Sequence, residues 1–289
     1  SVLMLFILYL TSDGRVNRWL DLGFIKIQPS EFAKVSLILA LSRFFHDIPL
    51  NEQGKILYSF LAIIIAAPVI FLTIVQPDLG TSIMQILLVS AIIFVAGLRI
   101  WMIVIAFAAS LASMPIIWFQ LHDYQKTRIL TFLDPNQDAL GAGYHITQSK
   151  IALGSGGIFG KGFLQGSQSH LNFLPEKQTD FIFTMLGEEF GLAGGLFIIM
   201  VFSLLILYGY IISFIQSSQF TRLMCVGIVF MLFSYVFVNI GMVSGIIPVV
   251  GAPLPLISYG GTSMLTTFIA FGLIMSASIH KNDKIDFKH

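Results

Sequence analysis

The fold is decided by residues 56–75, which read ILYSFLAIIIAAPVIFLTIV and carry no charged side chain. An α-helix needs about 20 predominantly apolar residues to cross the hydrocarbon core of a bilayer, and this segment has that length. Over the whole chain, 56% of the residues are hydrophobic and 11% are charged, whereas a soluble domain carries about 25% charged residues. The segment therefore predicts a transmembrane helix, and the composition predicts an integral membrane protein.

Further apolar segments extend this pattern in both directions along the chain. Residues 223–279 contain no Asp, Glu, Lys or Arg, and the Pro- and Gly-rich residues 247–255 divide them into two helices. Residues 1–10 are apolar but too short to cross a bilayer, so we read them as the end of a helix whose beginning is absent. The other predicted spans are residues 30–46, 79–98, 100–121 and 181–215.

The sequence thus predicts an all-α fold, a polytopic transmembrane helical bundle with seven full spans and an N-terminal stub, in a single integral membrane domain over residues 1–289. Residues 122–180 form a long polar loop between two apolar blocks. If this loop lies outside, seven Lys and Arg fall on the inner side and three on the outer side, not counting the loop itself. The positive-inside rule applies to short loops and therefore favours this orientation.

Charge and cysteine content exclude several classes of function. The net charge of +1 gives no sign of a nucleic-acid partner. Cys225 is the one cysteine, which excludes a disulfide framework. Three histidines, His122, His145 and His170, are scattered through the loop without metal-ligand spacing. We therefore expect no metal site and no cofactor, with a divalent cation left open.

The polar loop is rich in glycine, with eight glycines between Gly141 and Gly166. Lys150 and Lys161 are its two lysines between residues 139 and 175, a stretch that has no carboxylate. Exposed backbone N–H groups beside cations suit a phosphate or diphosphate, although no nucleotide-binding signature fits. Alternatively, the glycines only permit a closely packed loop at the level of the membrane. Composition alone favours this second reading.

Asp180 ends the loop and directly precedes an apolar helix. A carboxylate at a helix N-terminus is a good cap, and one at the lipid–water boundary is also a candidate general base. Asp78 precedes another helix, where capping is the favoured interpretation. Glu31 and Lys34 lie on one helix face, either lining a polar cavity or forming an interfacial pair that reaches toward water.

Motifs along the whole chain resemble the SEDS family (shape, elongation, division and sporulation). Lys150 and the run at residues 160–162 are similar to its rod-shape branch rather than its division branch. The principal matching motifs are RWLDLG (18–23), QPSEFAK (28–34), QPDLGT (76–81), GAGYH (141–145), GSGG (154–157), GKG (160–162), NFLPE (172–176), TDFIF (179–183), GEE (187–189), VNIGMV (238–243) and PLPLISYGG (253–261).

This resemblance implies a ten-helix membrane fold, of which the chain lacks the first two helices and most of the third. It implies a peptidoglycan glycosyltransferase of the bacterial cytoplasmic membrane that polymerises lipid II, an undecaprenyl-diphosphate-linked disaccharide-pentapeptide. Residues 122–180 become its extracytoplasmic catalytic loop. Asp180 falls on the family's essential aspartate, the general base of an inverting reaction. The residues implied in substrate binding are Arg18, Trp19, Lys26, Glu31, Lys34, Lys150, Lys161 and Glu176.

The implied partners are a class B penicillin-binding protein, which is a transpeptidase, together with the elongation machinery and membrane lipid. Two other functions stay open. A lipid II flippase would move the substrate across the membrane without making polymer. A non-catalytic scaffold for the transpeptidase would need helix surfaces but not the carboxylate of Asp180.

Overall fold

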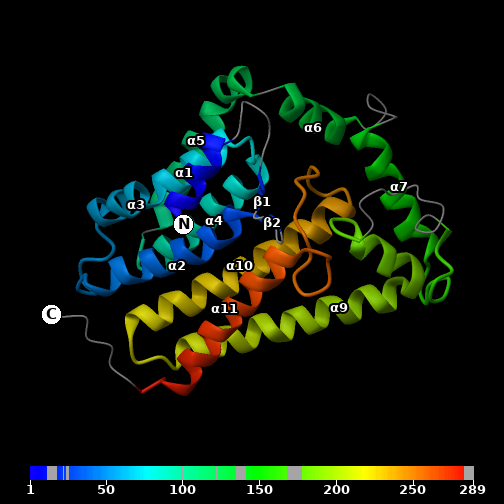
Figure 1. Ribbon diagram of the computed structural model, residues 1–289. Coiled ribbons are helices and arrows are strands. Elements are labelled where there is room, and N and C mark those ends of the chain that lie inside the picture. The colour runs from blue at the N-terminus through cyan, green and yellow to red at the C-terminus, as the bar shows by residue number, and fades with distance from the viewer. Residues whose placement is uncertain are drawn as a thin grey trace. The chain divides into compact units, whose positions relative to one another are not determined.

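The computed structural model describes residues 1–11, 18–21, 23, 26–98, 100–121, 123–134, 141–167 and 178–282, and Figure 1 shows its helices in chain order. The chain divides into two compact units. Unit 1 comprises residues 1–111, 206–233 and 261–289, and unit 2 comprises residues 112–205 and 234–260.

Unit 1 is built from helices and one very short antiparallel hairpin, in which Leu20 pairs with Ile27. Three helices of the chain belong only in part to this unit: the first half of α5, the last turns of α9 and the first half of α10. The elements are α1 (Val2–Thr11), β1 (Leu20–Asp21), β2 (Lys26–Ile27), α2 (Pro29–His46), α3 (Ile56–Val75), α4 (Leu79–Val95), α5 (Ile100–Gln120), α9 (Ile182–Phe214), α10 (Gln219–Val243) and α11 (Gly261–Ile279).

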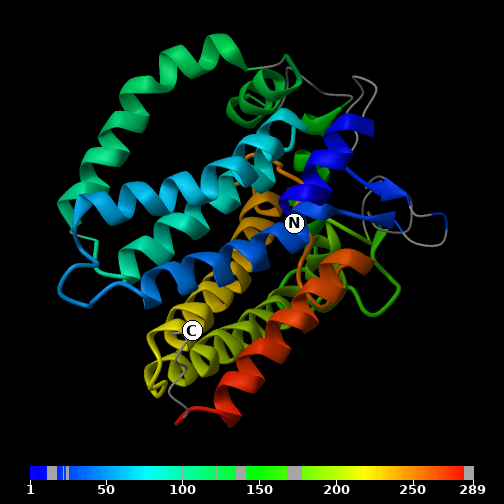
Figure 2. The ribbon, with the colours of Figure 1, turned by 60° about the vertical axis from the view of Figure 1, so that its left-hand side comes forward.

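A glycine lets α10 approach two other helices of unit 1. A Cβ atom at Gly227 would lie 2.8 Å from Cγ2 of Ile38 in α2 and 3.3 Å from Cδ1 of Ile92 in α4. Ile38 and Ile92 are both fully buried, so this crossing is part of the apolar core. Figure 2 shows α2 and α4 running beside each other, in agreement with their contacts.

The outer faces of several helices are apolar. Monomeric soluble proteins rarely expose large contiguous apolar patches. Among the residues described, four helices, α3, α9, α10 and α11, are long and apolar enough to cross a membrane, and α4 is a shorter apolar helix. The chain is thus a multipass membrane protein. Exposed apolar side chains of α3 include Ile56, Leu57, Phe60, Ile63 and Phe71.

All seven predicted spans are helices, and the all-α prediction is confirmed. The predicted division of residues 223–279 is also confirmed, because α10 ends at Val243 and α11 begins at Gly261. The crossing of all seven remains a prediction, since α2 carries three charged side chains and α4 has 17 residues. The predicted polar loop contains two helices of unit 2, α6 (Asp123–Leu133) and α7 (Ala142–Ser155).

The Gly-rich stretch after α7 fills a break in α9. Gly191 has non-helical dihedral angles, φ 66° and ψ −163°, which interrupt the hydrogen bonds of the helix. The loop replaces these bonds: the N–H groups of Lys161 and Gly162 donate to the carbonyls of Glu188 and Glu189, each at 3.0 Å. In return, the N–H groups of Leu192 and Ala193 donate to Gly157 and Ile158 at 2.9 and 3.0 Å.

Close packing, rather than phosphate binding, is therefore what this backbone provides. A Cβ atom at Gly160 would lie 2.0 Å from the carbonyl oxygen of Glu189, and one at Gly156 would lie 2.1 Å from that of Gly187. The close-packing reading that composition favoured is confirmed at Lys161 and Gly162, because the N–H groups of both already donate to α9.

Replacing Gly160 by alanine is expected to lower the melting temperature of the purified protein in detergent. The new Cβ atom would collide with backbone that cannot move aside, at a position whose φ of +80° is unfavourable for alanine, and such overpacking costs about 1–3 kcal/mol. The matched control is Gly154→Ala, because Gly154 lies in α7 with nothing within 4 Å of the added atom. Equal melting temperatures for the two variants would contradict this account of the loop.

Candidate active site

Asp180 lies in the turn that leads into α9, with its side chain half-buried. A Cβ atom at Gly251 would lie 3.3 Å from Oδ2 of Asp180, so this glycine lies close against the carboxylate. The backbone of the turn is held by bonds to residues much later in the chain, including one from the N–H of Tyr259 to the carbonyl of Gln178 at 2.8 Å. The structure thus holds the backbone of this carboxylate in place, in a residue that is half-buried.

Helix α7 packs close to the same turn. The hydroxyl groups of Ser149 and Thr184 are 2.7 Å apart, and Ser149 also donates to the carbonyl of Val243 at the end of α10. The ring of His145 lies 6.4 Å from the ring of Phe181, the residue after Asp180. These contacts place α7 between the start of α9 and the end of α10.

Lys150 follows Ser149 on α7 and is exposed. A Cβ atom at Gly245 would lie 2.0 Å from Cε of Lys150 and 2.4 Å from Nζ. The lysine side chain therefore extends across Gly245, where only a glycine leaves it space. Lys150 is thus a candidate for binding the diphosphate, because its side chain is accessible in this part of unit 2.

Lys161 has a different environment from Lys150. Its Nζ lies 2.7 Å from Oε1 of Glu188, a fully buried carboxylate of α9, and donates to the hydroxyl of Ser167 at 2.9 Å. The Ser167 hydroxyl lies 3.2 Å from the same Glu188 oxygen. A buried charge requires a close partner of opposite sign. The ammonium of Lys161 therefore neutralises Glu188 and ties the Gly-rich stretch to α9.

Replacing Lys161 by methionine is expected to destabilise the protein by about 1–3 kcal/mol, the cost of leaving a buried acceptor poorly satisfied. The measurement is thermal unfolding in detergent. A Lys161→Met/Glu188→Leu double variant removes the charge as well as its partner, so it is expected to regain most of the lost stability. If the double variant were less stable than Lys161→Met alone, the pairing would not be the main role of Lys161.

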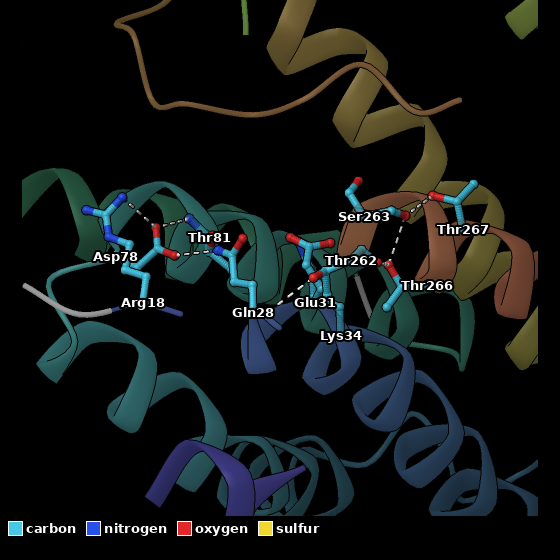
Figure 3. Close-up of polar contacts among 10 residues, drawn as sticks. All are labelled: Arg18, Gln28, Glu31, Lys34, Asp78, Thr81, Thr262, Ser263, Thr266 and Thr267. Atoms are coloured by element: carbon cyan, nitrogen blue, oxygen red, sulfur yellow. Dashed lines mark hydrogen bonds and ion pairs between the residues drawn. The ribbon is translucent and has the colours of Figure 1, made fainter. Parts of the chain in front are cut away.

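A second polar cluster lies in unit 1, around Asp78, which is the N-cap of α4 (Figure 3). Oδ1 of Asp78 accepts from the N–H of Thr81 at 3.4 Å, so the predicted capping role is confirmed. Arg18 donates to the carbonyl of Pro77 at 2.6 Å and lies 3.8 Å from the Asp78 carboxylate. The amide of Gln28 donates to Oδ2 of Asp78 at 3.3 Å.

Glu31 and Lys34 form a buried ion pair on the first turns of α2. Nζ of Lys34 lies 2.8 Å from Oε1 of Glu31, and the two side chains are only 2% and 6% exposed. The reading of this pair as an interfacial one that reaches toward water is wrong, because both groups are enclosed by unit 1. Figure 3 shows the pair beside Thr262, the residue that follows the start of α11.

Threonine side chains join the hairpin to α11. The hydroxyl of Thr262 accepts from the N–H of Gln28 at 3.3 Å and donates to the carbonyl of Lys26 at 3.2 Å. The side chain of Lys26 itself is 71% exposed and 3.8 Å from Asp21, and Trp19 is also exposed. Among the described residues of this region, Lys26 is thus an accessible cation and Trp19 an exposed aromatic ring.

Three helices begin in this cluster: α2 at Pro29, α4 at Leu79 and α11 at Gly261. Helix N-termini carry partial positive charge and unsatisfied N–H groups, which favour anions. The carboxylate of Asp78 already occupies the N-terminus of α4 and lies near Arg18, so it is the anionic group of this cluster that the structure shows.

The structure therefore sorts the sequence-predicted site residues by unit. Asp180, Lys150 and Lys161 belong to unit 2, and Glu176 lies outside the described residues. Sequence reasoning missed the Glu188 partner of Lys161 and the polar side chains Asn239 and Ser258 near Asp180. The available signal was the presence of polar side chains such as Asn239 and Ser258 within residues 223–279, which contain no Asp, Glu, Lys or Arg. Unit 1 holds Arg18, Trp19, Lys26, Glu31 and Lys34.

Comparison with known proteins places this arrangement in a family. Peptidoglycan glycosyltransferase MrdB of Escherichia coli (strain K12) is 48% identical over 270 residues, which cover 92% of this chain and 71% of MrdB. A solved structure described as "Structural coordination of polymerization and crosslinking by a peptidoglycan synthase complex" is 29% identical, with a TM-score of 0.83 over 98% of this chain and 79% of that one.

The rod shape determining protein RodA of Thermus thermophilus has the same fold. Its crystal structure matches with a TM-score of 0.68 and 25% identity, over 98% of this chain and 76% of that one. Residues 1–283 match the cell cycle protein family of FtsW, RodA and SpoVE. The chain therefore belongs to the FtsW, RodA and SpoVE family and is a peptidoglycan glycosyltransferase.

Proposed function

We propose that Asp180 is the general base with which this chain polymerises lipid II into glycan strands for cell-wall elongation and rod shape. The observation that carries this assignment is the carboxylate of Asp180 at the start of α9, in a half-buried residue whose turn is anchored by Asn239, Ser258 and Tyr259. A carboxylate in such a place can accept a proton from a hydroxyl group that enters beside it.

In the proposed reaction, Asp180 takes the proton from the 4-hydroxyl of the acceptor GlcNAc. The oxygen forms a bond to the anomeric carbon of the donor MurNAc, and the bond from that carbon to the diphosphate breaks. Undecaprenyl diphosphate leaves with the bonding electrons, and the configuration inverts. One base is sufficient because the diphosphate is a good leaving group when its charge is balanced.

The charge of the diphosphate calls for accessible cations. Lys150 in unit 2 and Lys26 in unit 1 are exposed, and we assign substrate binding to these two. Arg18 lies 3.8 Å from the buried carboxylate of Asp78, so we assign it a supporting role. Lys34 and Lys161 already neutralise buried carboxylates, so we assign them a supporting role. Trp19, Glu31 and Glu176 remain proposed contacts of the substrate region.

The proposed setting is the bacterial cytoplasmic membrane, with residues 122–180 on its outer face. The proposed partners are a class B penicillin-binding protein, the elongation machinery and membrane lipid, with no nucleic acid. We propose no cofactor beyond a possible divalent cation. The likeness to a synthase complex that coordinates polymerization and crosslinking supports the transpeptidase partner.

Fluorescent lipid II incubated with the purified protein, with and without its transpeptidase partner, tests this function. We expect glycan polymer that a muramidase digests. Transfer of lipid II across vesicle membranes without polymer would instead establish the flippase alternative. Restoration of cell shape by an Asp180→Ala variant would favour the scaffold.

A further inference from the structure

We propose that Asn239 is a positioning residue that holds the general base in place, an inference that rests on the proposed role of Asp180. Asn239 lies near the end of α10 and is fully buried. Its side-chain Nδ2 donates to the carbonyl of Asp180 at 2.9 Å and to the carbonyl of Ala252 at 2.7 Å. One amide group therefore joins the turn of Asp180 to the segment that follows α10.

The chemistry of an amide explains why asparagine suits this position. Its NH₂ group has two donors, and two buried carbonyl oxygens lie within reach of it. Turning the amide over would bring Oδ1 of Asn239 against both oxygens, which fixes its orientation. Leucine has a similar size but no donor, so it would leave the carbonyls of Asp180 and Ala252 without this partner.

The anchoring extends over three successive residues. The hydroxyl of Ser258 donates to the carbonyl of Thr179 at 2.6 Å, and the N–H of Tyr259 donates to the carbonyl of Gln178 at 2.8 Å. Ser258 is itself held by the N–H of Leu254, at 2.7 Å. The backbone of residues 178–180 is thus fixed to the end of α10 and to the segment after it.

These bonds hold the base in position through contacts with α10 and the segment after it, and not through the rest of the polar loop. Because the bonds involve main-chain carbonyls, they set where the Cα atom of Asp180 lies and do not use its carboxylate. A misplacement of about 1 Å at a catalytic group can lower the rate about 100-fold. Asn239 acts through Asp180 and has no assigned contact with lipid II.

The test compares Asn239→Leu with wild type in the lipid II polymerisation assay. We expect kcat to fall about 10- to 100-fold while KM for lipid II changes less than about twofold, because Asn239 positions the base and does not bind substrate. Gln216→Leu is the matched control: it removes a buried amide of unit 1 that donates to the carbonyl of Ile212, and we expect its kcat to match wild type.

Ser258→Ala keeps the proposal testable if Asn239→Leu does not fold. It removes the neighbouring anchor at Thr179, and we expect a lower kcat with an unchanged KM, as for Asn239→Leu. Wild-type kcat in a folded Asn239→Leu protein, or in folded Ser258→Ala when the leucine variant does not fold, would overturn the positioning role. Absence of polymer from wild type, or normal polymer from Asp180→Asn, would instead overturn the proposed function.

Discussion

Asp180→Asn is expected to lower the rate of lipid II polymerisation by about 10²- to 10⁴-fold, the usual contribution of a general base. Asparagine has nearly the same shape as aspartate but cannot accept the proton of the attacking hydroxyl. The contact between Asn239 and residue 180 uses the main-chain carbonyl, so the turn itself is expected to stay in place. The measurement is the initial rate of polymer formation at saturating lipid II.

A matched control separates the loss of the base from a general effect of removing a carboxylate. Asp47 is exposed and pairs with Arg43 at the end of α2, and Asp47→Asn is expected to keep the wild-type rate. Melting temperatures within a few degrees of wild type would show that both variants fold. Normal polymerisation by folded Asp180→Asn would remove the base assignment.

The sequence was sufficient for the helices because their signal is local. A run of about 20 apolar residues in a membrane protein has few possible structures other than a transmembrane helix. The prolines between residues 247 and 255 predict that one helix ends and another begins there. The capping role of Asp78 was predictable for the same reason, since the cap and its N–H partner are three residues apart.

The polar contacts were less predictable, because their partners are distant in the chain. Composition allowed Lys161 to be a free cation, whereas its partner Glu188 lies 27 residues later, just before the break in α9. The break itself depends on Gly191 meeting the Gly-rich loop. Asn239 and Asp180 are 59 residues apart in the chain, and no local sequence pattern at either residue predicts that they form a hydrogen bond.

Lys34→Met is expected to destabilise the protein by about 3–5 kcal/mol, because it leaves the buried carboxylate of Glu31 without its ammonium partner. The effect is measured by thermal unfolding in detergent. Lys55→Met is a close control: Lys55 and Glu52 have the same spacing and the same 2.8 Å separation, but their side chains are 57% and 34% exposed. Water screens the attraction in an exposed pair, so little change in stability is expected there.

The Glu31→Gln/Lys34→Met double variant decides what the pair is for. Removing both charges eliminates the uncompensated carboxylate, and replacement of a buried ion pair by neutral groups is often close to neutral for stability. Recovered stability together with a wild-type polymerisation rate would assign the pair a purely structural role at the start of α2. Recovered stability with a raised KM for lipid II would show that Lys34 also contributes to substrate binding, despite its burial. A double variant as unstable as Lys34→Met would contradict the electrostatic explanation, because the destabilisation would then come from the lost packing of the lysine side chain.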